Sequence, residues 1–162
     1  MMGECADTTS AARCGAVGSI AHGSLRMPTV VVFEKDRLLR DAMVAYLKRQ
    51  GYAVLETTAP ASVLNCLEHE SVQAAILDVY PAVQGVELLR RIRGRADLAH
   101  MPIIAILALT DSSEVLEYLE PGEYVRLPFD MPYLEWLLRS LLAKPFGDGH
   151  SASAAPPAEK NG

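Results

Sequence analysis

Apolar residues alternate along the middle of the chain between short continuous runs and longer amphipathic stretches. Continuous runs occupy residues 29–33 (TVVVF), 74–79 and 102–109, without the polar alternation of a strand that has one wet face. We therefore expect strands buried on both faces, as in a parallel sheet. Weaker strand patterns lie at residues 53–55 and 124–127.

The first two strands are each followed by residues with helical spacing. In the first helix we expect Asp36 as the N-cap and Gly51 as the stop. Its apolar stripe comprises Leu39, Ala42, Met43, Tyr46 and Leu47. In the second helix we expect Thr58 as the cap, and the apolar face comprises Val63, Cys66 and Leu67.

Three further helices are expected later in the chain. Residues 85–93 follow the third strand, and Asp111 and Glu114 have capping-box spacing before a short helix. The last helix begins after Asp130, with a stripe of Leu134, Leu137, Leu138, Leu141 and Leu142. Strand and helix thus alternate five times, which predicts an α/β fold, with a five-stranded parallel sheet covered by helices on both faces.

Composition narrows the class of protein. The 162 residues are 50% hydrophobic and 22% charged, as in a globular domain with tails. A net charge of −5 disfavours nonspecific binding to nucleic acid, and no apolar run reaches the ~18 residues of a membrane span. The three irregularly spaced cysteines fit a reducing compartment, so we expect a cytoplasmic protein without nucleic-acid or membrane partners.

The two ends of the chain differ from the middle. Residues 1–27 are rich in small residues and lack the pattern of a signal peptide, so we expect a flexible N-terminal tail. Residues 145–162 are expected to form a disordered C-terminal tail, which leaves residues 28–144 as the domain. The tail is too short for an output domain, so we expect a stand-alone module. The sequence leaves open whether Met27 is the start codon.

Candidate chemistry lies where the strands end, because sites in such sheets form at the carboxyl edge. Glu34, Lys35 and Asp36 follow the first strand, and Asp78 ends the third. The first loop has no glycine and brings two carboxylates, so a flavin or nucleotide enzyme is only a remote alternative. The histidines and cysteines lack metal-ligand spacing, and no nucleophile motif is present. We therefore expect neither a metal centre nor an enzyme.

Five segments, taken in order, resemble the receiver domains of bacterial two-component response regulators. They are VVVFEKDRLLRDAM (30–43), AAILDVYP (74–81), GVELLRRIR (85–93), PIIAILAL (102–109) and EYVRLPFD (123–130). The resemblance covers residues 28–144 and implies a flavodoxin-like, doubly wound (βα)5 sandwich. It also implies signalling by protein–protein binding, with a histidine kinase, another signalling protein or a second copy as the partner.

The resemblance assigns roles by position. Asp78 matches the phosphoacceptor, and Glu34 matches the first residue of the acidic pair that helps to hold Mg²⁺. Lys35 replaces the second acid. Three switch positions complete the set: Leu107 replaces a hydroxyl residue, Leu127 replaces a lysine, and Tyr124 matches the aromatic switch residue.

These replacements predict a degenerate, or pseudo-receiver, domain. Phosphoryl transfer needs cations on the phosphoryl oxygens, and a metal ligand, an ammonium and a hydroxyl are missing. We expect weak or absent Mg²⁺ binding, with the Lys35 ammonium against Asp78 and Glu34 in place of the metal. The alternatives are that Lys35 points into solvent, and that the domain is an active single-domain regulator accepting a phosphoryl group on Asp78.

The partner surface is expected on the last helix. A helical projection places Trp136 and Tyr133 opposite the leucine stripe, so both should point outward and anchor a partner. By the resemblance, they would lie on the face formed by helix 4, strand 5 and helix 5. We expect its acidic edge to be a polar rim or an ordinary solvated face, and it comprises Glu114, Glu117, Glu120 and Glu123. A basic cluster is expected to be another solvated face, and it comprises Arg90, Arg91, Arg93 and Arg95.

Overall fold

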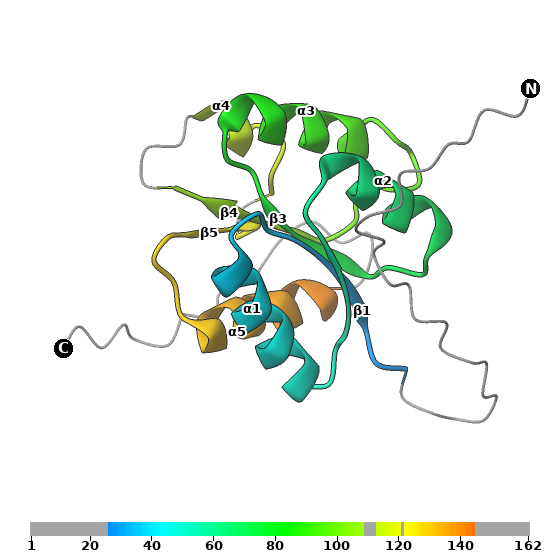
Figure 1. The fold of residues 1–162 in the computed structure, drawn as a ribbon. Coiled ribbons are helices and arrows are strands. Elements are labelled where there is room, and N and C mark those ends of the chain that lie inside the picture. The colour runs from blue at the N-terminus through cyan, green and yellow to red at the C-terminus, as the bar shows by residue number, and fades with distance from the viewer. Residues whose placement is uncertain (1–25, 109–112, 121, 145–162) are drawn as a thin grey trace, which may run out of the picture.

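The computed structural model describes residues 26–108, 113–120 and 122–144, in which strands and helices alternate (Figure 1). The strands are β1 (Thr29–Phe33), β2 (Ala53–Thr57), β3 (Ala74–Asp78), β4 (Ile103–Leu107) and β5 (Tyr124–Arg126). The helices are α1 (Arg37–Arg49), α2 (Pro60–His69), α3 (Ala82–Arg93), α4 (Ser113–Leu116) and α5 (Met131–Leu142). Almost all of the N-terminal tail, the whole C-terminal tail and Asp111 of the expected capping box lie outside the described residues.

The five strands form one parallel sheet in the order β2-β1-β3-β4-β5. Strand β1 lies inside the sheet, β2 pairs with it on one side, and the chain then crosses to β3 on the other side. The carboxyl ends of β1 and β3 are therefore neighbours at the point where the strand order reverses. The expected α/β fold is confirmed.

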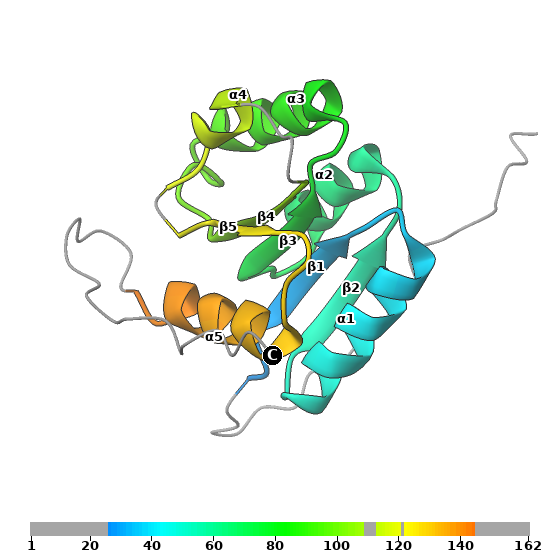
Figure 2. The same ribbon diagram turned by 90° about the vertical axis from the view of Figure 1, so that its left-hand side faces the viewer.

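Helices cover both faces of the sheet, so the domain has three layers. Figure 2 shows α1 and α5 on one face and α2, α3 and α4 on the other. Alternate residues of each strand point to opposite faces: Val30 and Val32 join the cluster under α1 and α5, and Val31 and Phe33 join the cluster under the other helices. This two-sided burial is the reason that the central strands are continuously apolar.

Local signals explain most helix starts. The Asp36 carboxylate accepts a hydrogen bond from the Leu39 N–H at 2.8 Å, which confirms the expected cap of α1. The expected cap of α2 is wrong by one residue: Ala59 is the N-cap, and the Thr57 hydroxyl accepts its N–H at 3.2 Å. Asp130 precedes α5 as expected, although its side chain makes no capping hydrogen bond.

Two helices differ from the expected pattern. In α1 the buried residues are Met43, Val44 and Leu47, whereas Ala42 of the predicted stripe is exposed. Helix α3 begins at Ala82, three residues before the predicted start at Gly85. Gly85 is a buried position inside the helix, and it allows α3 to approach the end of β3 closely.

Candidate functional site

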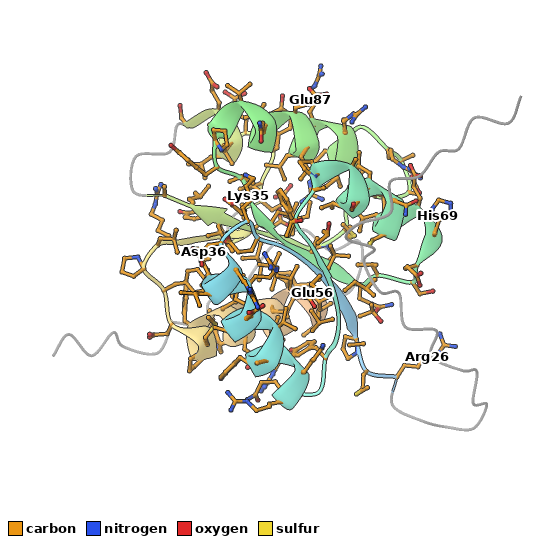
Figure 3. All side chains as sticks on the ribbon, in the orientation of Figure 1. Arg26, Lys35, Asp36, Glu56, His69 and Glu87 are labelled. Atoms are coloured by element: carbon orange, nitrogen blue, oxygen red, sulfur yellow. The ribbon has the colours of Figure 1, made fainter. Side chains whose placement is uncertain are left out.

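Three of the predicted site residues meet at the carboxyl edge of the sheet. Glu34 and Lys35 directly follow β1, and Asp78 is the last residue of β3. Phe33 pairs with Leu77 in the register of these adjacent parallel strands, so the residues that follow are brought together. Figure 3 shows Lys35 and Asp36 between the end of β1 and the start of α1.

The Lys35 ammonium pairs with Asp78. Its Nζ lies 3.4 Å from Asp78 Oδ2 and also donates a hydrogen bond to the Tyr80 carbonyl. The other carboxylate oxygen, Oδ1, accepts the Tyr80 N–H at 2.9 Å. Nζ also lies 5.3 Å from the centroid of the Phe33 ring, a cation–π distance. Both oxygens of Asp78 therefore have partners within the chain.

The pair is only partly shielded from water. The side chain of Lys35 is 39% exposed and that of Asp78 is 13% exposed. A pair at this exposure contributes little to the free energy of unfolding, because solvent screens the attraction. Its effect is local: it places a fixed positive charge beside the carboxylate.

Glu34 does not join this pair, which corrects half of the predicted contact. Its side chain is buried, and its Oε1 accepts the Asp36 N–H at 2.8 Å. Burial raises the pKa of the Glu34 carboxyl, and the nearby charge of Asp78 raises it further, although the Asp36 N–H opposes the shift. Glu34 thus helps to fix the loop that presents Lys35.

The residues present do not fit a Mg²⁺ site. Carboxylate and carbonyl oxygens are the ligands that Mg²⁺ takes, and the two offered by Asp78 and Tyr80 already accept hydrogen bonds from Lys35. A protonated lysine donates and has no lone pair for a metal. Among the described residues, no group of three or more His, Cys, Asp or Glu side chains is arranged to hold an ion. Weak Mg²⁺ binding stays a prediction.

The side chains of Leu107 and Leu127 have no hydrogen-bond donor, and Tyr124 lies at the start of β5 rather than at the carboxyl edge of the sheet. Leu107 is fully buried at the end of β4, and its carbonyl accepts the Leu127 N–H at 2.9 Å. Leu127 is partly exposed just after β5. Tyr124 is half-buried against the α2–α4 side of the core, and its ring centroid lies 5.7 Å from the Arg126 guanidinium.

Tyr133 and Trp136 lie differently from the helical projection. Their rings are stacked, with centroids 5.8 Å apart. Both residues are half-buried and pack on the core cluster under α1 and α5, so Trp136 is less exposed than the projection predicts, and its role as a partner anchor stays a prediction. A helical projection considers only the direction of the Cα–Cβ bond. A large indole ring can lie along the helix surface and contact the core even when that bond points away from it.

Sequence reasoning missed an ion pair, largely shielded from water, between the last residue of α3 and the residue before β5. The Arg93 guanidinium lies 2.8 Å from Glu123 Oε2, with side-chain exposures of 16% and 6%. The expectation of solvated faces is therefore wrong for both residues, although Arg90 and Arg91 are exposed as expected. Nothing local in the sequence pairs two residues 30 positions apart.

The fold and the residues at the carboxyl edge of the sheet indicate the class of protein. An open parallel sheet of this order, with an acid after β1 and an aspartate ending β3, is the architecture of a signalling receiver. The chain belongs to the response regulator receiver domain family, whose model matches residues 30–135. No helix in the described part of the chain is both long and apolar enough to cross a membrane.

Curated relatives agree with the family. The chain is 35% identical over 130 residues to the transcriptional regulatory protein CseB of Streptomyces avermitilis, covering 78% of this chain and 54% of the relative. It is 29% identical over 118 residues to the response regulator MprA of Mycobacterium tuberculosis, covering 71% and 50%. The chain thus spans about half the length of the curated relatives it matches.

Solved structures match the same fold. A response regulator from Thermotoga maritima aligns with a TM-score of 0.63 and 21% identity, covering 73% of this chain and 99% of that one. The receiver domain of a sensor histidine kinase from Pseudomonas aeruginosa, solved with magnesium in its active-site cleft, aligns at 0.65 and 20%, with the same coverage. At these identities the likeness concerns the fold alone.

Proposed function

We propose that this receiver domain signals in the cytoplasm by protein–protein binding, with Asp78 neutralised by Lys35 and without regular Mg²⁺-dependent phosphorylation. The observation behind the proposal is the position of Lys35 Nζ between Asp78 Oδ2 and the Tyr80 carbonyl. The ammonium supplies a fixed positive charge where a receiver would use a metal ion. The domain has no catalytic activity of its own in this proposal.

The neighbouring leucines support the same proposal. A phosphoryl group on Asp78 would bring charged oxygens that need cations or hydrogen-bond donors around them. Leu107 at the end of β4 and Leu127 just after β5 have apolar side chains, so they offer neither a cation nor a hydrogen-bond donor. The partner would be a histidine kinase, another signalling protein or a second copy of the chain.

A second candidate is an active receiver that accepts a phosphoryl group on Asp78. Membership of the family favours it, and the comparisons taken by themselves support it better than the first candidate. The aspartate is present at the end of β3 and retains some exposure to solvent. In this case Lys35 would have to leave Asp78 or pair with the phosphoryl oxygens.

One experiment separates the two candidates. The full chain is incubated with acetyl phosphate and Mg²⁺, and the intact mass is measured, with Asp78→Asn as the matched control. We expect no phosphoryl adduct on the wild type. An adduct that the control lacks would establish the second candidate and overturn the first.

Restoring the missing groups extends this test. Lys35→Asp should recover Mg²⁺ binding in calorimetry but little phosphorylation, because the leucines still offer no contact to the phosphoryl oxygens. Adding Leu107→Thr and Leu127→Lys should then allow the adduct to form. Full phosphorylation of Lys35→Asp alone would show that the two leucines do not matter.

A further inference from the structure

The Arg93 side chain connects four separate backbone segments. From the last turn of α3, its Nε donates to the Tyr118 carbonyl at 3.2 Å, and its Nη1 donates to the carbonyls of Ala99 and Met101 at 3.2 and 2.7 Å. Its Nη2 donates to Glu123 Oε2 at 2.8 Å. One guanidinium therefore holds the residues before β4, the turn after α4 and the start of β5 to α3.

Glu123 completes the same junction from the other side. Its Oε2 also accepts the Glu120 N–H at 2.8 Å, and its Oε1 accepts the Ile103 N–H at 3.4 Å. Its backbone carbonyl accepts the Ala105 N–H at 2.9 Å, which starts the pairing of β4 with β5. The carboxylate is buried, so its charge depends on the guanidinium for compensation.

Helix α4 has little stability of its own. It has four residues, Ser113–Leu116, and a single helical turn does not form alone in water. Its tertiary support comes from the buried Val115, from the partly buried residues that follow, and from the bond between Arg93 and the Tyr118 carbonyl. The position of α4 therefore depends on the junction more than on local propensity.

We propose that the Arg93–Glu123 pair is a conformational latch that fixes α4 and β5 against α3, independently of the acidic edge at Asp78. The inference rests on the proposed function, in which the side chains of Leu107 and Leu127 cannot contact a phosphoryl group by a hydrogen bond or a charge. The latch holds the α4–β5 surface in one arrangement, ready for a partner without any chemical step.

Hydrogen exchange of the full chain tests the latch. Arg93→Gln and Glu123→Gln should each accelerate amide exchange at least ~10-fold in residues 115–120 and 123–126, because the first leaves the buried Glu123 carboxylate uncompensated and the second removes the carboxylate that orients the guanidinium. Peptides from β1 and β3 should keep their protection. Arg90→Gln is the matched control, since Arg90 pairs with the exposed Glu87 on the outer side of α3 (Figure 3) and should change nothing.

The pattern of exchange decides the outcome. Unchanged exchange in α4 and β5, or equal acceleration throughout the sheet, would overturn the latch, because a merely structural ion pair would loosen the whole domain. Glu123→Gln preserves the side-chain volume, so it decides the matter if Arg93→Gln does not fold. The double variant should exchange no faster in these residues than either single variant.

The latch and the proposed function can fail separately. A phosphoryl adduct on the wild type, measured by mass after acetyl phosphate and Mg²⁺ are added, overturns the proposed function. Amide hydrogen exchange of the Arg93 and Glu123 variants, measured without a phosphodonor, supports or overturns the latch whatever the outcome for the proposed function.

Discussion

Gly85→Ala is the substitution for which the structure gives the clearest steric expectation. A Cβ at this position would lie 2.5 Å from the Cβ of Val79 and 2.8 Å from its carbonyl carbon, and it would also clash with the Val79 carbonyl oxygen. Two of these atoms are backbone, so they cannot rotate away. Helix α3 must retreat from the end of β3 by about 1 Å to restore ordinary contacts.

The magnitude follows from two opposing effects. Overpacking a filled site costs up to about 3 kcal/mol, and a clash with backbone belongs at the upper end. Alanine is the better helix former by about 1 kcal/mol. The net loss should be about 2 kcal/mol, which lowers the Tm of a domain of this size by roughly 8 °C.

Thermal and urea unfolding measure this loss, with Gln84→Ala as the control at an exposed position of the same helix. Since Val79 follows Asp78 directly, the retreat should also disturb the Tyr80 carbonyl that accepts from Lys35. If Gly85→Ala is as stable as Gln84→Ala, α3 does not approach β3 as described and the steric argument fails.

The remaining predictions concern single side chains. Asp36→Ala should cost about 1 kcal/mol in urea unfolding because it removes a capping bond, and Asp130→Ala, which removes none, should cost less; equal losses would contradict the cap assignment. The folded pKa of Glu34 is raised above 4.5, so its contribution to stability is present below that pH and is lost as pH rises through the folded pKa. Glu34→Gln should therefore be more stable than the wild type at pH 7 and lose that advantage below pH 4.5; a less stable variant at pH 7 would refute the shift. Trp136→Ala should lower the free energy of unfolding by about 2 kcal/mol, because the ring packs on the core. An unchanged Tm would show that the ring contributes nothing to the core and would favour its predicted role as an exposed partner anchor. Lys35→Met should cost less than ~1 kcal/mol, as for any partly exposed ion pair, and a larger loss would show that the pair stabilises the fold.

The fold could be predicted because its signals are local. The apolar runs at β1, β3 and β4 indicate two-sided burial, and Asp36 caps α1 through residues close to it in sequence. The predicted start of α3 at Gly85 is three residues late, because Gly85 lies inside the helix, where its missing side chain allows packing against Val79. Such close approaches depend on tertiary contacts, which the spacing of hydrophobic residues along the sequence does not indicate.

The candidate site could be predicted only in part. Parallel strands bring their carboxyl ends to one edge of the sheet, and the resemblance to receiver domains implied that Lys35 would lie against Asp78, as it does. The conformation of the loop decides which oxygen atoms the Lys35 ammonium contacts. The Glu34 carboxylate accepts the Asp36 N–H and does not contact Lys35 as predicted. Arg93 and Glu123 resemble ordinary surface charges in the sequence, because burial of a charge leaves no local pattern.

The open sheet also bears on the behaviour of the domain at high concentration. In the part of the chain that the structure describes, β2 and β5 are the outer strands, each with one side whose backbone groups could pair with another molecule. Strand β5 has three residues with an exposed Arg126, and the nearby Pro128 has no N–H to donate. Strand β2 presents the exposed Glu56. Short length and proline at β5, and a charge on β2, hinder strand addition from a neighbouring chain while the domain is folded, whereas a core substitution that loosens it would expose the apolar central strands.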